Sequence, residues 1–187
     1  SVTIVAEEND RILERTWIFI PEGRIDEKNA IERLDYRQYI EQGDVIACGN
    51  KTIDYGVIED FVENLPNMLG VEIQAIGYDR YNALSSAQKW DKSFTTVQIR
   101  QHSDTLHPPT KLLSEKIENG ELEYEKNAIL ELNFTNARCV YDTNMNRYVA
   151  KKKSAGKIDG VVSLINAVCL LRLDRFMNDN MDWVAQT

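Results

Sequence analysis

Residues 1–21, SVTIVAEENDRILERTWIFIP, decide the kind of sheet that this chain can build. Two runs rich in β-branched and aromatic residues, with a rough alternation of apolar and polar side chains, flank the turn-forming pair Asn9-Asp10. This pattern predicts an antiparallel β-hairpin, and we expect Pro21 to end its second strand because proline cannot donate to a strand ladder. A sheet that starts from such a hairpin becomes mixed once crossover-connected strands are added to it.

Strand and helix patterns alternate after this hairpin, which is typical of an α/β sheet covered by helices on both faces. The expected strands span 44–49, 71–79 and 94–101, and the expected helices span 26–42, 52–66, 82–90, 108–120, 127–137 and 157–177. Residues 138–153 form a second expected hairpin, with turn residues at DTNMN. We therefore expect a single α/β domain over residues 1–187, with a mixed sheet flanked by helices and an added β-hairpin before the C-terminal helix.

The composition limits the classes of function. The net charge of −8 and the pI of about 4.9 give no general attraction to nucleic acid, so DNA contact needs a local basic patch, and residues 147–157 form the one dense patch. The three cysteines include no CxxC pair, and His102 and His107 lack the spacing of a zinc motif. No apolar run predicts a membrane span, and SVTIVAEEND lacks the basic start of a signal peptide.

Two aspartates at the starts of predicted helices are candidates for metal binding. Asp79 follows the most apolar internal strand pattern, and Asp159 opens the last helix. Each has a simpler interpretation, because aspartate is favoured at helix N-termini. Gly160 costs the last helix roughly 1 kcal/mol relative to alanine, which suggests that its backbone approaches something closely. If the two carboxylates meet beside the sheet, their oxygens could bind Mg²⁺ or Mn²⁺.

Lysines precede Asp159 closely in the sequence. Lys151, Lys152 and Lys153, with Lys157, could contact the phosphates of a DNA backbone, although a lysine run is more often a solvated strand end. Asp142, in the second hairpin, is a weaker candidate for the site, and a turn-forming role is the simpler interpretation.

Several segments together resemble a known family. The segments WIFIPEG (17–23), IDYGVIEDFV (53–62), YDRYNA (78–83) and KIDGVVSLINA (157–167) occur in an order and at spacings similar to the nuclease domain of tailed-phage terminase large subunits. The resemblance covers nearly all of the chain. It implies a ribonuclease H-like fold and a metal-dependent endonuclease that cuts concatemeric viral double-stranded DNA during genome packaging. It also implies the small terminase subunit and the portal protein as partners, no membrane, and the host cytoplasm as the location.

In this family three acidic residues hold two divalent cations, Mg²⁺ or Mn²⁺. The resemblance implies that Asp79 is the second of these residues and Asp159 the third. No residue matches the first, so we expect either that residues upstream of Ser1 supply it or that an altered ligand such as Glu7 replaces it. No P-loop is present, so the ATPase motor half of a terminase is not expected within this chain.

Two other readings remain open at this point. The chain could be a non-catalytic ribonuclease H-like module that docks to the portal or to the small subunit. It could also be another ribonuclease H-like enzyme, such as a transposase or a junction resolvase, although WIFIPEG and IDYGVIEDFV favour a terminase.

Overall fold

The predicted N-terminal hairpin stands at the centre of the fold. The computed structural model describes residues 1–185, without the side chains of Asn82 and of residues 174–185. β1 (Val2–Glu8) and β2 (Arg11–Ile20) pair in antiparallel fashion from Val2 opposite Trp17 to Glu8 opposite Arg11. Asn9 and Asp10 close the turn with φ angles of 50° and 62°, a conformation that these residue types tolerate well. The hairpin prediction is confirmed.

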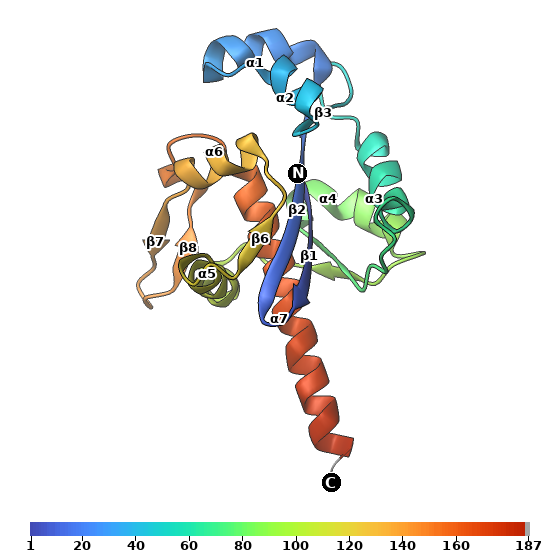
Figure 1. Ribbon diagram of the computed structural model, residues 1–187, viewed down its shortest axis with the longest axis vertical. Helices are drawn as coiled ribbons and strands as arrows, with labels where there is room; N and C mark the ends of the chain where they lie inside the picture. Colours follow the sequence, from blue (N-terminus) through green and yellow to red (C-terminus); the bar gives the residue numbers. More distant parts are fainter. Residues whose placement is uncertain (186–187) are drawn as a thin grey trace.

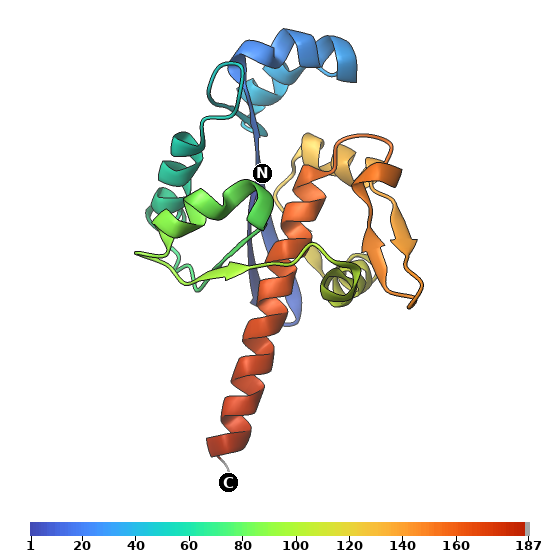
Figure 2. The same cartoon turned by 180° about the vertical axis from the view of Figure 1, so that it is seen from behind.

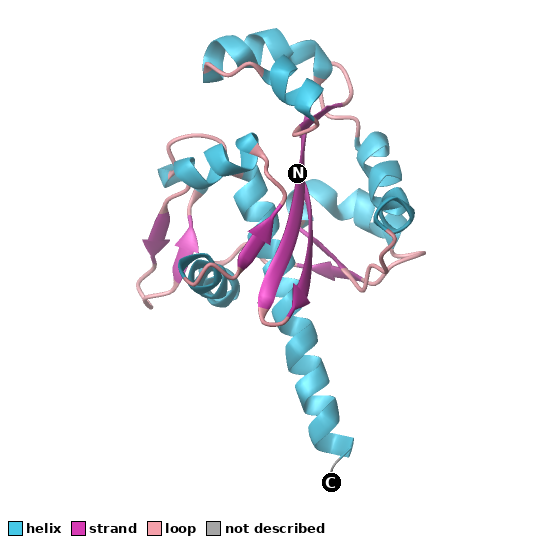
Figure 3. Cartoon of the chain, viewed as in Figure 1, coloured by secondary structure: helices cyan, strands magenta, loops and turns pink. Residues whose placement is uncertain are grey.

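The sheet is mixed because β2 also pairs with two parallel strands. β6 (Leu122–Tyr124) lies along the first part of β2, and β3 (Val45–Ala47) lies along its last part. Two further strand pairs are separate: the parallel pair of β4 (Ile76–Tyr78) and β5 (Thr96–Gln98), and the antiparallel hairpin of β7 (Cys139–Tyr141) and β8 (Arg147–Val149) (Figure 3). The expected α/β class, with a mixed sheet and an added hairpin before the last helix, is confirmed.

Helices surround the central hairpin (Figures 1 and 2). They are α1 (Ile25–Glu32), α2 (Tyr36–Gln42), α3 (Tyr55–Leu69), α4 (Arg80–Trp90), α5 (Ser103–Glu118), α6 (Ala128–Asn136) and α7 (Asp159–Ala185). In Figure 1, α3 and α4 lie on one side of β1 and β2, whereas α5, α6 and the β7–β8 hairpin lie on the other. α7 passes behind the hairpin and extends beyond the sheet. None of the described helices is long and apolar enough to cross a membrane.

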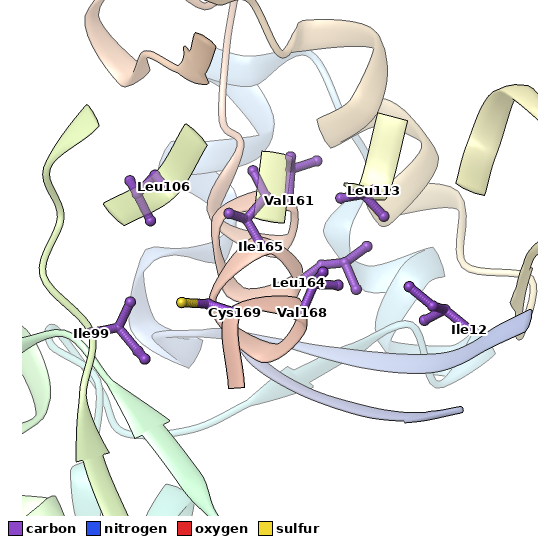
Figure 4. Close-up of a cluster of buried hydrophobic side chains, with 9 residues drawn as sticks. All are labelled: Ile12, Ile99, Leu106, Leu113, Val161, Leu164, Ile165, Val168 and Cys169. Carbon is purple, nitrogen blue, oxygen red and sulfur yellow. The ribbon is translucent and has the colours of Figure 1, made fainter. Parts of the chain in front are cut away.

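α7 carries the main hydrophobic core along one of its faces. Val161, Leu164, Ile165 and Val168 recur at helical spacing, and each is at least 97% buried. Figure 4 shows these side chains between Ile12 of β2 and the apolar side chains of α5. This packing fixes α7 against the sheet, and it therefore fixes the position of Asp159 at the start of the helix.

The strands are shorter than their sequence patterns predict. The predicted strand over 71–79 is only Ile76–Tyr78, and the predicted strand over 94–101 is only Thr96–Gln98. β6 was not predicted, because Leu122–Tyr124 follows a helix without an apolar run of its own. These three residues form a strand because they pair with β2, which provides the backbone hydrogen bonds that a short segment cannot make alone. Tertiary contact, rather than local pattern, decides these short strands.

Three helix boundaries also differ from the predictions. The helix predicted over 26–42 is two helices, because Arg33 adopts a left-handed conformation with φ of 55°. Pro66 lies inside the last turn of α3 and does not end it; Gly70, with φ of 66°, follows the helix as its cap. Pro108 and Pro109 lie in the second turn of α5, which begins earlier than predicted, at Ser103. Each proline removes one backbone donor, and the packing of α5 compensates.

Candidate metal and DNA site

Asp79 begins α4, directly after β4. Its backbone is extended, with φ of −85° and ψ of 124°, and its Oδ1 accepts a hydrogen bond from the Tyr81 N–H at 3.2 Å. The capping interpretation of Asp79 is therefore confirmed. Asp79 thereby lies at the positive end of the helix dipole. Its position at the carboxyl end of a parallel strand is also one where open α/β sheets place functional groups.

Asp159 is the first residue of α7 but does not cap it. Ile158 occupies the capping position, because its carbonyl accepts the first helical hydrogen bond, from Val162 N–H at 3.0 Å. The backbone N–H of Gly160, the second residue of α7, donates to Asn133 Oδ1 of α6 at 3.0 Å. The Asp159 carboxylate is thus not used by its own helix. Its Oδ1 accepts from Lys151 Nζ at 2.7 Å.

The Asp159 side chain is half exposed and held in one direction by Lys151. Burial acts to raise the pKa of this carboxyl, but the hydrogen bond and charge of Lys151, together with the charges of the N-terminus and Lys157, bring the pKa below its usual value. Asp159 is consequently an anion at neutral pH. The Ser1 hydroxyl donates to the Asp159 carbonyl at 2.8 Å, so the start of β1 lies beside the start of α7.

Asn133 was not predicted as a residue of the site. It is 97% buried in α6, and its amide donates to the Ile129 carbonyl at 2.7 Å while its Oδ1 caps Gly160. Asn133 thereby ties the first turn of α7 to α6. The one sequence signal was an asparagine in a helix interior, where its side chain normally competes with the backbone.

Gly160 is explained by packing and not by a bound group. A Cβ at this position would lie 3.0 Å from Leu130 Cδ1 and 3.2 Å from Ile18 Cδ1. The close approach that the sequence suggested is therefore the contact of α7 with α6 and β2. Glycine at this position lets Asp159 sit close to the sheet.

We expect Gly160→Ala to lower the free energy of unfolding by roughly 1 kcal/mol. Overpacking against Leu130 and Ile18 costs about 1–3 kcal/mol, and the better helix propensity of alanine offsets up to about 1 kcal/mol of it. Gly56→Ala is the matched control, because a Cβ there meets only Asp54 Oδ1 in the first turn of α3. Urea unfolding of both variants measures the difference, and equal stabilities would contradict the packing explanation.

β4 and α7 bring Asp79 and Asp159 to neighbouring elements. Gly77 of β4 packs against Leu170 of α7, where a Cβ would meet Leu170 Cδ1 at 3.0 Å. Within residues 1–185, no group of three or more His, Cys, Asp and Glu side chains is arranged to hold a metal ion. Mg²⁺ is commonly held by one or two carboxylates, with water and substrate phosphates as its other ligands, and the joint binding of an ion by Asp79 and Asp159 stays a prediction.

Glu7 does not lie where the first acidic ligand is expected. Ser1 is beside Asp159, and Glu7 follows six residues later along the extended strand β1, opposite Ile12. At about 3.4 Å per residue, Glu7 is roughly 20 Å further along the hairpin. The suggestion that Glu7 replaces that ligand was therefore wrong.

The four candidate lysines lie in the segment that precedes α7. Lys151, Lys152 and Lys153 form a short 3-10 turn, and all four side chains are exposed. Lys151 is the one that the structure joins to Asp159, and the Lys157 carbonyl accepts from the Asn136 side chain at 3.1 Å. Lys151 thus places a positive charge at the Asp159 carboxylate, and Lys152 and Lys153 follow it in the turn after β8.

Asp142 organises the turn of the β7–β8 hairpin. Ser103 Oγ donates to its carboxylate at 2.6 Å, and the Asn146 amide and two backbone N–H groups of the turn donate as well. These hydrogen bonds, that of Ser103 first, hold the pKa of Asp142 well below its usual range. His107 Nδ1 of α5 accepts from the Arg147 N–H at 2.8 Å. Both side chains fix the hairpin to α5, so the turn interpretation of Asp142 is confirmed.

Comparisons with known proteins agree with this architecture. Residues 1–174 match the family described as "Terminase large subunit, endonuclease domain". The large terminase subunit of Enterobacteria phage HK97 is 22% identical over 156 residues, which are 81% of this chain and 30% of that protein. The crystal structure of the HK97 bacteriophage large terminase superposes with a TM-score of 0.82 at 20% identity, covering 90% of this chain and 36% of that one. The chain thus spans about a third of the relatives that it matches, and the superposition shows the same ribonuclease H-like fold.

Proposed function

The chain belongs to the family of terminase large subunit endonuclease domains, and on that premise we propose that it is a metal-dependent endonuclease. Its substrate would be concatemeric viral double-stranded DNA, cut during genome packaging. The whole chain, residues 1–187, would be a single nuclease domain, and translocation by an ATPase motor would reside outside it because the sequence contains no P-loop.

The observation that carries this proposal is the placement of two aspartates at the starts of helices on neighbouring elements. Asp79 follows β4, and Asp159 opens α7, against which β4 packs. Neither carboxylate is buried in the core, and Asp159 is kept anionic by Lys151. Hard divalent cations select such oxygen ligands, which supports Asp79 and Asp159 as the residues that would hold Mg²⁺ or Mn²⁺.

A cation held there would supply Lewis-acid polarisation of the scissile phosphate and a lower pKa for an attacking water, and the family resemblance implies two such cations. The chain's own residues provide the positioning. Asn133 fixes the first turn of α7, and Lys151 orients the Asp159 carboxylate. Lys152, Lys153 and Lys157 would contact backbone phosphates without reading sequence.

The same family membership leads us to propose the partners. They are the DNA itself, the small terminase subunit and the portal protein, with the host cytoplasm as the location. The alternative function is a non-catalytic module that docks to the portal or to the small subunit. The described part of the chain has no three-residue metal cluster, and this observation supports the docking function as the alternative.

Cleavage of a supercoiled plasmid separates these functions. We expect nicking or linearisation in Mn²⁺ or Mg²⁺ and none in EDTA, since the proposed chemistry requires the cation. Equal cleavage in EDTA would exclude the metal-dependent mechanism. No cleavage in any metal would favour the docking module, and pull-down with the portal and small subunit would then test that function directly.

A further inference from the structure

A hollow of about 450 Å³ lies at the end of β5, between the first turns of α5 and the middle of α7. Figure 2 shows the chain leaving β5 and passing across α7 to reach α5. Ile99, Pro108 and Leu173 give the hollow apolar walls, and Arg100 and Arg172 lie among them. The hollow therefore combines apolar surface with two guanidinium groups from different elements.

The two arginines of the hollow lack partners in the part of the chain that the structure describes. Four other arginines form ion pairs with glutamate or aspartate: Arg11, Arg15, Arg24 and Arg37. Among the described residues, no hydrogen bond or ion pair engages Arg100 or Arg172, and both are exposed. In a chain of net charge −8, two unpaired arginines in one hollow are available to an external anion. The planar guanidinium binds phosphate through two parallel hydrogen bonds.

Asp104 is the acidic residue that lines this hollow, and its carboxylate is engaged. Oδ1 accepts from the Thr105 N–H at 2.6 Å and from Thr105 Oγ1 at 3.1 Å, and His102 Nδ1 lies 3.1 Å away. The Thr105 backbone donor, first among several causes, lowers the pKa of Asp104. Asp104 thus carries one negative charge against the two positive charges of the arginines, which leaves the hollow cationic.

The hollow adjoins the candidate metal site. Ile99 N–H donates to the Tyr78 carbonyl at 2.9 Å, and Tyr78 immediately precedes Asp79. Arg100 follows Ile99 and is the second residue after β5, the strand that pairs with β4, and Asp79 is the first residue after β4. A DNA strand whose scissile phosphate lies at Asp79 can therefore continue past the end of β5.

We propose that this hollow binds a sugar-phosphate unit of the DNA strand next to the scissile phosphate. Arg100 and Arg172 contact the phosphate, and the apolar walls pack against the deoxyribose. This inference rests on the proposed nuclease function and adds a second contact region, apart from the lysines around Asp159. An acidic peptide would pair with the arginines, but its carboxylates would leave the apolar walls of the hollow uncovered.

Equilibrium binding of a duplex in EDTA tests the proposal without cleavage. The variants are Arg100→Gln, Arg172→Gln and the double variant, each titrated from low to physiological ionic strength. Each lost phosphate contact is expected to reduce the slope of log affinity against log salt by about 0.9, and to weaken binding roughly five- to tenfold near 0.1 M salt. The double variant is expected to lose both contributions.

Arg33→Gln is the matched control, since Arg33 is exposed, at the end of α1, and also without a recorded partner among the described residues. It is expected to leave the slope unchanged. A double variant with the slope of the control overturns the proposal, as does a wild-type chain that does not bind the duplex. Polyglutamate serves as a second probe in the same titration. A double variant that loses binding to polyglutamate but still binds the duplex as wild type does would overturn the proposal in favour of an acidic protein partner. A chain that binds DNA through the arginines but does not cut it would refute only the nuclease function.

Discussion

Asp79→Asn is expected to abolish metal-dependent cleavage of plasmid DNA while leaving the stability of the domain unchanged. Asparagine caps helices as well as aspartate does, so its amide oxygen can still accept the Tyr81 N–H and α4 should keep its start. The substitution removes the negative charge that a divalent cation requires. A loss of several kcal/mol of transition-state stabilisation corresponds to a rate lower by roughly a thousandfold or more.

The control for this prediction is another aspartate with the same structural role. Asp54 caps α3, and its Oδ1 accepts from the Gly56 N–H at 2.9 Å. Asp54→Asn preserves that cap in the same manner, and no catalytic role is proposed for it. Initial cleavage rates in Mn²⁺, together with urea unfolding, compare the two variants. If Asp79→Asn cuts as fast as Asp54→Asn, then Asp79 is a helix cap only.

Asp159→Asn is expected to have the same effect on cleavage. Its ion pair with Lys151 joins two side chains that are each about half exposed, and such pairs contribute about 0–1 kcal/mol to stability. Lys151→Ala breaks the same ion pair but keeps the carboxylate. We expect the alanine variant to retain much more activity than Asp159→Asn, because it loses only the orientation of the ligand. Equal losses in the two variants would mean that the ion pair, and not the carboxylate, is what cleavage needs.

The sequence predicted the central hairpin and the long helices because their patterns are local. The alternation in residues 1–21 and the spacing of Val161, Leu164, Ile165 and Val168 are visible without any partner. The three-residue strands could not be bounded in this way, since β6 exists only because β2 offers an edge to it. The interior prolines of α3 and α5 misled the boundary predictions because tertiary packing holds those helices through the missing hydrogen bonds.

The candidate site shows the same division. Asp79 and Asp159 were predicted from local signals, a strand end and a helix start, and their role in metal binding stays a prediction. Asn133 and the arginines of the hollow were missed, since their roles arise from elements far apart in the sequence. The sequence indicated a close approach at Gly160 without identifying the neighbour, and the structure shows that Leu130 and Ile18 are the side chains in contact. A glycine in a helix indicates that another group lies close to the backbone, but the sequence does not identify that group.

A buried carboxyl group on β2 leads to the second large prediction. Glu14 is 94% buried on the face of the hairpin that carries Ile12. Thr16 Oγ1 donates to its Oε2 at 2.8 Å, and the Thr16 hydroxyl also meets that of Thr3 at 2.8 Å. Its other oxygen, Oε1, has no hydrogen-bond partner among the described residues. Burial raises the pKa of Glu14 from its ordinary 4.5 to about 7, although the Thr16 hydroxyl opposes the shift.

The raised pKa fixes the sign of the pH dependence. Below pH 4.5 Glu14 is protonated in the folded and the unfolded chain alike, so it imposes no penalty on folding. Between pH 4.5 and about 7 the unfolded chain ionises while the folded chain keeps the proton, and the folded state becomes progressively less favourable. Above pH 7 the full penalty of about 3 kcal/mol is present, since each unit of pKa shift corresponds to roughly 1.4 kcal/mol.

Glu14→Gln is therefore expected to be close to wild type in stability at pH 5 and about 2–3 kcal/mol more stable than wild type at pH 8. The neutral amide can accept from Thr16 and does not ionise inside the hairpin. Urea unfolding at both pH values measures the difference, with Glu8→Gln, an exposed position on the same hairpin, as the control that should follow the wild-type curve. A variant that tracks wild type at both pH values would show that Glu14 is ionised without penalty, and hence that water or an ion reaches Oε1 in solution. The opposite sign, with the variant weaker at pH 8, would mean that the charge stabilises the hairpin.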